Sequence, residues 1–124
     1  MAITLTFFFC GDAAQVLSKF RHPNIAQLYG YHLSLKEQPY LIYELGEKGS
    51  LDKFWKDELG RQRLGSFQRR VEIAYQVLTA ILFLHHGNDE FGTCFHRDIK
   101  SANIVLADNF TAKLIDCGLA KFIR

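Results

Sequence analysis

The stretch 94-CFHRDIKSANIVL-106 contains the densest group of polar, chemically active side chains in the sequence. Within it, Asp98 is followed two residues later by Lys100 and five residues later by Asn103. A second carboxylate, Asp116, lies ten residues beyond the stretch and directly precedes Cys117. Two carboxylates, one amide and one ammonium group at this spacing predict a single chemical site.

These four side chains match the requirements of phosphoryl transfer to a hydroxyl. A carboxylate and a neutral amide oxygen suit Mg²⁺, which also binds substrate phosphates. A lysine places positive charge beside a phosphate, and a remaining carboxylate can accept or orient a hydroxyl proton. Asp98 and Asp116 could instead be caps of turns or helices, but their joint spacing with Lys100 and Asn103 disfavours that alternative.

Composition narrows the class of protein further. The 124 residues fit one small domain, and the net charge of +2 gives no basic stripe, so nucleic-acid binding is not expected. Three widely spaced cysteines favour a reducing compartment and argue against a disulfide framework or a zinc site. No apolar run reaches the roughly 20 residues of a membrane span, and the apolar segment 3–10 lacks the other features of a signal peptide.

A long helix is predicted before the stretch and a small β-hairpin at its end. Strands are expected at 103–106 and 111–115. Apolar residues that recur at steps of three and four predict a helix over 67–85 that starts near Ser66. The expected buried stripe contains Phe67, Val71, Ala74, Leu78, Ile81 and His85, widened by Val77, Leu82 and Leu84. We therefore expect this helix to be buried on most sides.

The segments farther upstream predict a mixed architecture. Two runs rich in aromatic and aliphatic residues, 26–33 and 39–45, indicate another β-hairpin. Ser50 is expected to cap a short helix at 51–59, and a loop is expected at 60–65. Together with a helix over 12–20, these elements favour the α+β class over a βαβ sheet.

The central stretch resembles the catalytic loop of protein kinases, in which a His-Arg-Asp triplet is followed by a lysine and an asparagine. The triplet 116-DCG-118 resembles the family's metal-binding Asp-Phe-Gly motif, with a smaller Cys117 in place of Phe. The segments 22-HPNIAQLYGY-31 and 40-YLIYELGEKGSL-51 are similar to those that lead into the nucleotide hinge. The stretch 96-HRDIKSANIVL-106 resembles the tyrosine-kinase-like branch, which includes receptor-like and interleukin-receptor-associated kinases. Within it, Lys100 is the serine/threonine signature.

The resemblance implies a role for each matching residue at the catalytic loop. Asp98 would orient the substrate hydroxyl and take its proton, and Lys100 would contact the transferred phosphate. Asn103 and Asp116 would hold Mg²⁺. The implied cofactors are therefore ATP and Mg²⁺, and the implied partner is a protein substrate.

The resemblance also implies an adenine and ribose site. The Glu44 carbonyl and the Gly46 amide would meet the adenine edge, Val105 would pack under the ring, and Ser50 would contact the ribose. Tyr43 would be the gatekeeper behind the adenine. A stacked apolar spine is implied as well, made of Leu17, Leu28, His96 and Cys117.

The expected fold is an incomplete protein-kinase-like fold, with a partial kinase domain at 12–124 and an unassigned segment at 1–11. The sequence contains no glycine-rich phosphate loop, no Val-Ala-Ile-Lys strand and no Ala-Pro-Glu segment. We therefore expect little kinase activity from this chain alone, and an apolar face of the 67–85 helix left uncovered. The implied localisation is cytoplasmic, on the inner side of a membrane receptor in a longer parent.

Two alternatives to an active kinase fragment stay open. The first is a pseudokinase-like binding or scaffold module, although the survival of Asp98, Asn103 and Asp116 argues against it. The second is a non-functional product of a truncated gene model. On that hypothesis the Phe-rich residues 1–11 are translated intron, which transcript reads across this junction would test.

Overall fold

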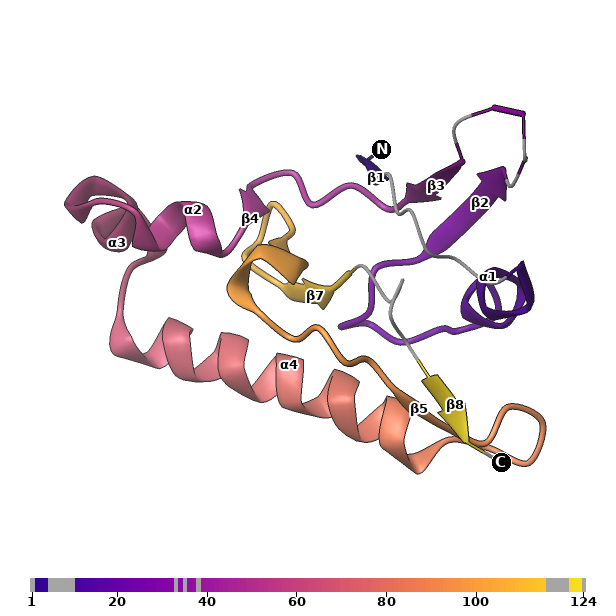
Figure 1. Cartoon of the computed structure of the whole chain (residues 1–124). Helices are drawn as coiled ribbons and strands as arrows, with labels where there is room; N and C mark the ends of the chain where they lie inside the picture. The colour runs from indigo at the N-terminus through magenta and orange to yellow at the C-terminus, as the bar shows by residue number, and fades with distance from the viewer. Residues whose placement is uncertain are drawn as a thin grey trace.

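The computed structural model describes residues 2–4, 11–32, 34, 36–37, 39–115 and 121–123. Figure 1 shows a long helix, α4 (Phe67–His86), running beneath the other elements. The first β-hairpin and the short helix α1 (Gly11–Leu17) lie above one end of α4, and two short helices lie above its other end. This mixture of helices and small antiparallel sheets agrees with the predicted α+β class.

Helix α1 begins close to the predicted start but ends three residues early. After Leu17 the backbone tightens, because the amides of Lys19 and Phe20 donate to the carbonyls three residues before them, at 3.0 and 3.2 Å. The Ser18 hydroxyl also donates to the Gln15 carbonyl at 2.7 Å. These local bonds replace the α-helical pattern before Pro23, which restricts the residue that precedes it.

The first sheet contains the predicted hairpin and one strand that was not predicted. Strands β2 (Leu28–His32) and β3 (Tyr40–Tyr43) pair antiparallel, which confirms the hairpin. Strand β1 (Ala2–Thr4) pairs with the free edge of β3, giving the order β1-β3-β2. The sequence of β1 alone is too short to carry an alternating pattern, so its partner strand decides its structure.

The second sheet joins the hairpin at 104–114 to the connector that follows β3. Strands β6 (Ile104–Leu106) and β7 (Ala112–Leu114) form the predicted hairpin. Strand β4 (Gly49–Ser50) adds to the other edge of β6, giving the order β4-β6-β7. The predicted cap was therefore wrong: Ser50 is a strand residue, and α2 (Asp52–Trp55) begins after Leu51 without a side-chain cap.

A helix replaces the loop predicted at 60–65. Helix α3 (Glu58–Leu64) is capped by Asp57, whose carboxylate accepts a hydrogen bond from the Gly60 amide at 2.6 Å. The glycine at position 60 favoured the loop prediction, but in the structure Gly60 allows α3 to lie close to the backbone of α2. A Cβ at this position would lie 2.9 Å from the Phe54 carbonyl oxygen, so the two helices approach too closely for a side chain.

Helix α4 has the predicted ends, but of the predicted buried stripe only Val77 and Leu84 are buried. Ser66 caps it by accepting a hydrogen bond from the Arg69 amide at 3.3 Å, and Gly87 ends it with a φ of 64°. The buried positions are Ile73, Val77, Ala80 and Leu84. The exposed apolar positions are Phe67, Val71, Tyr75, Leu78, Leu82 and Phe83. The helix is apolar on two sides, and the described elements cover only one of them, so burial on most sides was wrong.

Asn24 connects α4 with both parts of the molecule. Its Nδ2 donates to the Ala112 carbonyl at 3.0 Å, and its Oδ1 accepts from the Thr79 hydroxyl at 3.1 Å. Its backbone carbonyl accepts from the Leu114 amide at 2.8 Å. The Ala26 amide donates back to the Leu114 carbonyl at 2.9 Å. The segment before β2 is thereby attached to β7 and to α4.

A third pairing closes the molecule below the first hairpin. Strand β5 (Thr93–Phe95) pairs antiparallel with β8 (Lys121–Ile123), near the C-terminal end of α4 (Figure 1). Neither strand was predicted, because each is only three residues long. Within the described residues, no helix combines the length and the apolar character that crossing a membrane demands.

Candidate active site

Three contacts, made by the side chains of Lys100 and Asn103, hold Asp98 in place. Its Oδ2 lies 3.3 Å from the Lys100 Nζ and accepts a hydrogen bond from the Asn103 Nδ2 at 3.0 Å. The same Nδ2 donates to the Asp98 backbone carbonyl at 2.9 Å. The bond from Lys100, followed by the bond from Asn103, lowers the pKa of the Asp98 carboxyl, although partial desolvation opposes this shift. Asp98 is therefore a carboxylate at neutral pH.

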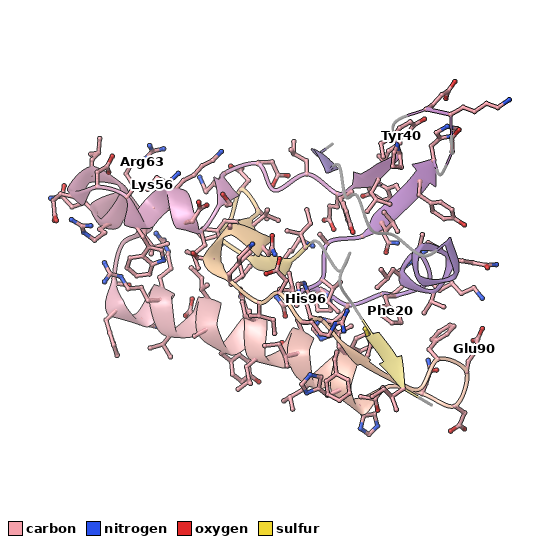
Figure 2. All side chains as sticks on the ribbon, in the orientation of Figure 1. Phe20, Tyr40, Lys56, Arg63, Glu90 and His96 are labelled. Carbon is pink, nitrogen blue, oxygen red and sulfur yellow. The ribbon has the colours of Figure 1, made fainter. Side chains whose placement is uncertain are left out.

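His96 positions the backbone on which Asp98 sits. Figure 2 shows His96 near the middle of the molecule, and its side chain is 1% exposed. Its Nδ1 accepts a hydrogen bond from the Asp98 amide at 3.1 Å, so its Nε2 carries the proton and lies 3.0 Å from the Ile115 carbonyl. Neutral imidazole is the form that satisfies both contacts, so His96 has a structural role, as expected.

The turn between these two residues requires an unusual backbone. Arg97 has a φ of 67°, in the left-handed region that residues other than glycine rarely adopt. Such a conformation persists only where surrounding contacts stabilise it. Here the Asp98 amide donates to the His96 side chain, and the Asp98 carbonyl accepts from the Asn103 side chain.

Asn103 brings the catalytic loop next to the segment that precedes Asp116. It ends the 3₁₀ helix η1 (Ser101–Asn103) and is 6% exposed. Its backbone carbonyl accepts from the Ile115 amide at 2.9 Å. Its side-chain amide donates twice to Asp98, and its Oδ1 accepts no hydrogen bond from the described part of the chain. An amide oxygen left open in this way suits a hard cation. Asp116 itself lies outside the described residues.

The predicted adenine residues lie together at the junction of the two sheets. A Cβ built on Gly46 would lie 2.5 Å from the Val105 Cβ, so the hinge backbone touches the Val105 side chain. Ser50 is the strand partner of Val105 in the β4–β6 pair. The Glu44 carbonyl and the Gly46 amide make no backbone hydrogen bond with another described residue, so both remain available to a ligand edge.

Lys113 was missed by the sequence reasoning. Its Nζ lies 3.0 Å from the Glu44 Oε1, with side-chain exposures of 15% for Lys113 and 29% for Glu44. The Gln27 amide donates to the other carboxylate oxygen of Glu44 at 3.2 Å. These contacts hold the start of the hinge against β7. A single lysine in a strand gives no signal of such pairing unless the strand's neighbour is known.

The other predicted residues are only partly placed. Of the implied spine, Leu17, Leu28 and His96 are buried, whereas Cys117 lies outside the described residues. Tyr43 is buried at the end of β3. Cys94 is a buried free thiol, and burial raises its pKa to about 11, so it stays protonated at neutral pH.

Comparison with known proteins gives the family. The profile of the protein tyrosine and serine/threonine kinases matches residues 8–124. The chain is 38% identical over 109 residues to the leucine-rich repeat receptor protein kinase EMS1 of Arabidopsis thaliana. It is 40% identical over 105 residues to the probable L-type lectin-domain containing receptor kinase V.3 of the same plant. The chain therefore belongs to the protein kinase family. It is a partial kinase domain that resembles the kinase domains of plant receptor-like kinases.

The matches cover most of this chain but little of its relatives. They include 88% of the chain and 9% of EMS1, and 85% of the chain and 15% of the lectin-domain kinase. The chain thus spans less than a sixth of the length of these relatives, and their substrates and partners do not transfer with the family.

Proposed function

We propose that the chain supplies the lower half of a serine/threonine protein kinase site that uses ATP and Mg²⁺. The observation that carries this proposal is the arrangement of Asp98, which is ionised, fixed by His96 through its backbone and held by Lys100 and Asn103 through its side chain. The preference for serine and threonine rests on Lys100 and on the receptor-like relatives.

Asp98 is proposed to orient the substrate hydroxyl and accept its proton. Because its pKa is lowered, it is a weak base, and its main contribution is to align the hydroxyl oxygen with the reacting phosphate. The Lys100 side chain is 56% exposed, and its ammonium group contacts only Asp98 among the described residues, so its charge can shift to a phosphate. Alignment and charge placement are the main sources of catalysis in phosphoryl transfer.

Asn103 and Asp116 are proposed to hold Mg²⁺, through the open Oδ1 of Asn103 and the Asp116 carboxylate. When bound, the ion would neutralise charge on the nucleotide phosphates. The Asn103 Nδ2 donates two hydrogen bonds to Asp98, and these bonds fix the direction in which the Asn103 Oδ1 points. Asn103 therefore links the position of the metal ligand to the position of the base.

The adenine ring is proposed to lie against Val105, with its edge at the Glu44 carbonyl and the Gly46 amide, and the ribose near Ser50. The contact between Gly46 and Val105 supports this placement, since it brings the hinge backbone next to the Val105 side chain. The ion pair between Glu44 and Lys113 keeps the hinge in place.

Residues 12–124 are proposed to be a partial kinase domain whose parent functions at the cytoplasmic side of a membrane receptor and acts on a protein substrate. The glycine-rich loop and its lysine would complete the site from above. Without them the triphosphate loses much of its positioning, so this chain alone should transfer phosphate at a negligible rate. Robust turnover by the purified chain that disappears in the Asp98→Asn variant would contradict this expectation.

A chimera tests the proposed site directly. Residues 12–124 would replace the matching segment of the EMS1 kinase domain, and autophosphorylation would be measured. We expect activity that falls about 10²–10⁴-fold in Asp98→Asn. Asp89→Asn, the same change at an exposed position after α4, should leave it unaltered. A folded chimera that is inactive, or one equally active with Asn at position 98, would contradict the proposal.

A binding or scaffold role is the second candidate, and one observation favours it. An apolar cavity of about 460 Å³ opens between α2, α3 and α4, lined mainly by aliphatic side chains such as Leu64, Val77 and Leu78. A scaffold would bind partners through such a face without using nucleotide. A rise in melting temperature with ATP and Mg²⁺ would favour the kinase role, and no response to nucleotide would favour the scaffold.

A further inference from the structure

A small pocket with an excess of positive charge lies beside the short helices α2 and α3. Its volume is about 180 Å³, and it opens between the segment 48–54 and α3. Lys48, Lys53 and Arg63 line it, and so does the carboxylate of Asp57. Figure 2 shows Arg63 on α3, at the end of the molecule opposite the first hairpin. None of these four residues belongs to the proposed catalytic or adenine groups.

Acidic groups balance little of the positive charge in this pocket. Neither Lys53 nor Arg63 forms an ion pair with another residue in the part of the chain that the structure describes. The Lys48 Nζ lies 3.7 Å from the Asp108 Oδ1, but the Asp108 side chain is 88% exposed. Ion pairs as exposed as this one contribute little free energy. The Lys48 ammonium group can therefore move from Asp108 to a ligand at low cost.

The Asp57 carboxylate is already used by the fold. It caps α3, and its Oδ1 accepts a hydrogen bond from the Gly60 amide at 2.6 Å. Asp52, the acidic neighbour of Lys53, pairs instead with Lys56 at 3.7 Å and is not part of the lining. Among the lining residues that the structure describes, three cations are thus balanced by a single carboxylate. The pocket suits an anion.

Packing holds two of these cations at the pocket. A Cβ built on Gly49 would lie 3.3 Å from the Lys53 Nζ, so the ammonium group lies over the backbone of β4. The Lys48 Nζ lies 4.7 Å from the centre of the Phe110 ring, a distance at which the ring attracts a cation. Phe110 lies beside Phe54, which lines the pocket, with ring centres 6.3 Å apart. Cations held before a ligand arrives reduce the entropy lost on binding.

The size of the pocket selects the kind of anion. Sites for drug-sized ligands have volumes of about 300–1,000 Å³, so a pocket of about 180 Å³ is too small for a whole nucleotide. A phosphorylated serine or threonine side chain is smaller, and it carries a charge of about −1.5 to −2 and three acceptor oxygens at neutral pH. Phe54 and Leu59 add apolar surface for the carbon atoms next to the phosphate.

We propose that the pocket of Lys48, Lys53 and Arg63 binds a phosphoserine or phosphothreonine side chain of a partner protein. The family to which this chain belongs forms phosphorylated side chains, so a kinase domain encounters such ligands. The pocket would hold an already phosphorylated protein beside the kinase site. Binding there requires neither nucleotide nor the catalytic loop, so its test does not depend on the proposed function.

The test measures binding of the peptide Gly-Ala-phosphoserine-Ala-Gly to the complete chain by fluorescence anisotropy. The peptide has blocked ends and a neutral label, so the phosphate is its only charge. We expect it to bind at least about tenfold more tightly than the same peptide with unmodified serine, the effect of one hydrogen bond to a charged group. The affinity should fall as salt rises. Inorganic phosphate should bind more weakly, because it lacks the carbon atoms that contact Phe54 and Leu59.

Substitutions of opposite sign separate the effect of charge from damage to the fold. Asp57→Asn removes the one acidic residue in the lining that the structure describes, and asparagine also caps well. Affinity for the phosphopeptide should then rise about threefold. Lys53→Gln and Arg63→Gln should each lower it about tenfold. Arg61→Gln is the matched control and should leave it unaltered, because Arg61 is on α3, pairs with Glu58 at 3.1 Å and does not line the pocket.

Three results would overturn the proposal. The first is equal affinity for the phosphorylated and the unmodified peptide, or equal affinity for inorganic phosphate and the phosphopeptide. The second is a loss of affinity in Asp57→Asn, or a loss in Arg61→Gln as large as that in Arg63→Gln, which would mean that net charge governs binding. The third concerns vesicles of phosphatidylcholine that contain phosphatidylinositol phosphate: vesicle binding that requires Arg63, with no binding of the phosphopeptide, would assign the pocket to a membrane.

Discussion

Among single residues, Gly46 has little room for a side chain. Replacement by alanine would place a Cβ at 2.5 Å from the Val105 Cβ, well inside van der Waals contact. Either strand β6, which contains Val105, or the backbone at residue 46 must therefore move. Overpacking of this kind costs about 1–3 kcal/mol. Since the moved backbone carries the Gly46 amide, we also expect weaker adenosine binding.

Gly30 provides the control for this substitution. It lies in strand β2, and nothing lies within 4 Å of the Cβ that alanine would add there. Chemical denaturation should therefore show a clear loss of stability for Gly46→Ala and little change for Gly30→Ala. Equal stabilities for the two variants would mean that the hinge does not contact Val105 as described.

Asn24 is a second residue whose removal should be costly. Asn24→Ala leaves the Ala112 carbonyl without its side-chain partner, whereas the Thr79 hydroxyl keeps the Gln76 carbonyl at 2.7 Å. Each buried polar group left unsatisfied costs about 1–3 kcal/mol. We expect the free energy of unfolding to fall by about 1–3 kcal/mol, measured in urea.

The control for Asn24 is Asn109, an exposed asparagine in the β6–β7 turn. Its Oδ1 accepts a hydrogen bond from the Thr111 amide at 3.0 Å, where water can replace it. Asn109→Ala should cost well under half as much. If both variants lose the same stability, the bridge from Asn24 to α4 contributes nothing beyond a local turn.

At the catalytic loop, the sequence was informative because the chemistry depends on residue type and spacing. Lys100 and Asn103 each lie within hydrogen-bonding distance of Asp98. The contact of Lys113 with Glu44 could not be predicted in the same way. It depends on the fold, which brings β7 next to the segment after β3, and not on a motif.

At the scale of elements, α4 shows the limit of periodicity. Its apolar residues make two stripes, and both satisfy helical spacing. Only the contacts with β5 and β7 decide that the stripe containing Ile73 is buried while the one containing Leu78 is exposed. Short elements were harder still: β1, β5 and β8 are three residues long, and Gly60 concealed α3.

Two alanine substitutions on α4 test which stripe is buried. Ile73 is 4% exposed, so Ile73→Ala should remove about 2–5 kcal/mol from the free energy of unfolding, through lost burial and a new cavity. Leu78 is 53% exposed, so Leu78→Ala should change it by about 0.5 kcal/mol or less. Urea denaturation should show a larger loss of stability for Ile73→Ala than for Leu78→Ala. A larger loss for Leu78→Ala would mean that α4 is rotated about its axis relative to the structure described here.

At the scale of the whole molecule, the uncovered stripe of α4 is the dominant surface feature. The exposed stripe and the cavity of about 460 Å³ beside α2 and α3 together form an apolar surface that is exposed to water. Soluble proteins rarely expose continuous patches of this kind, and such patches drive association. We therefore expect the purified chain to self-associate as its concentration rises, and more strongly in salts that strengthen hydrophobic burial.

Charge placed on this stripe should reverse the association. In the double variant Leu78→Lys and Leu82→Lys, two exposed leucines of α4 become cations, which cannot be buried against an apolar surface without a large desolvation cost. Analytical ultracentrifugation should then show a smaller association constant. Leu59→Lys is the matched control, because Leu59 is 64% exposed on α3 and lies outside the stripe. If that control disperses the chain equally well, net charge and not the α4 surface governs association; if the double variant associates like the unaltered chain, the contact is made elsewhere.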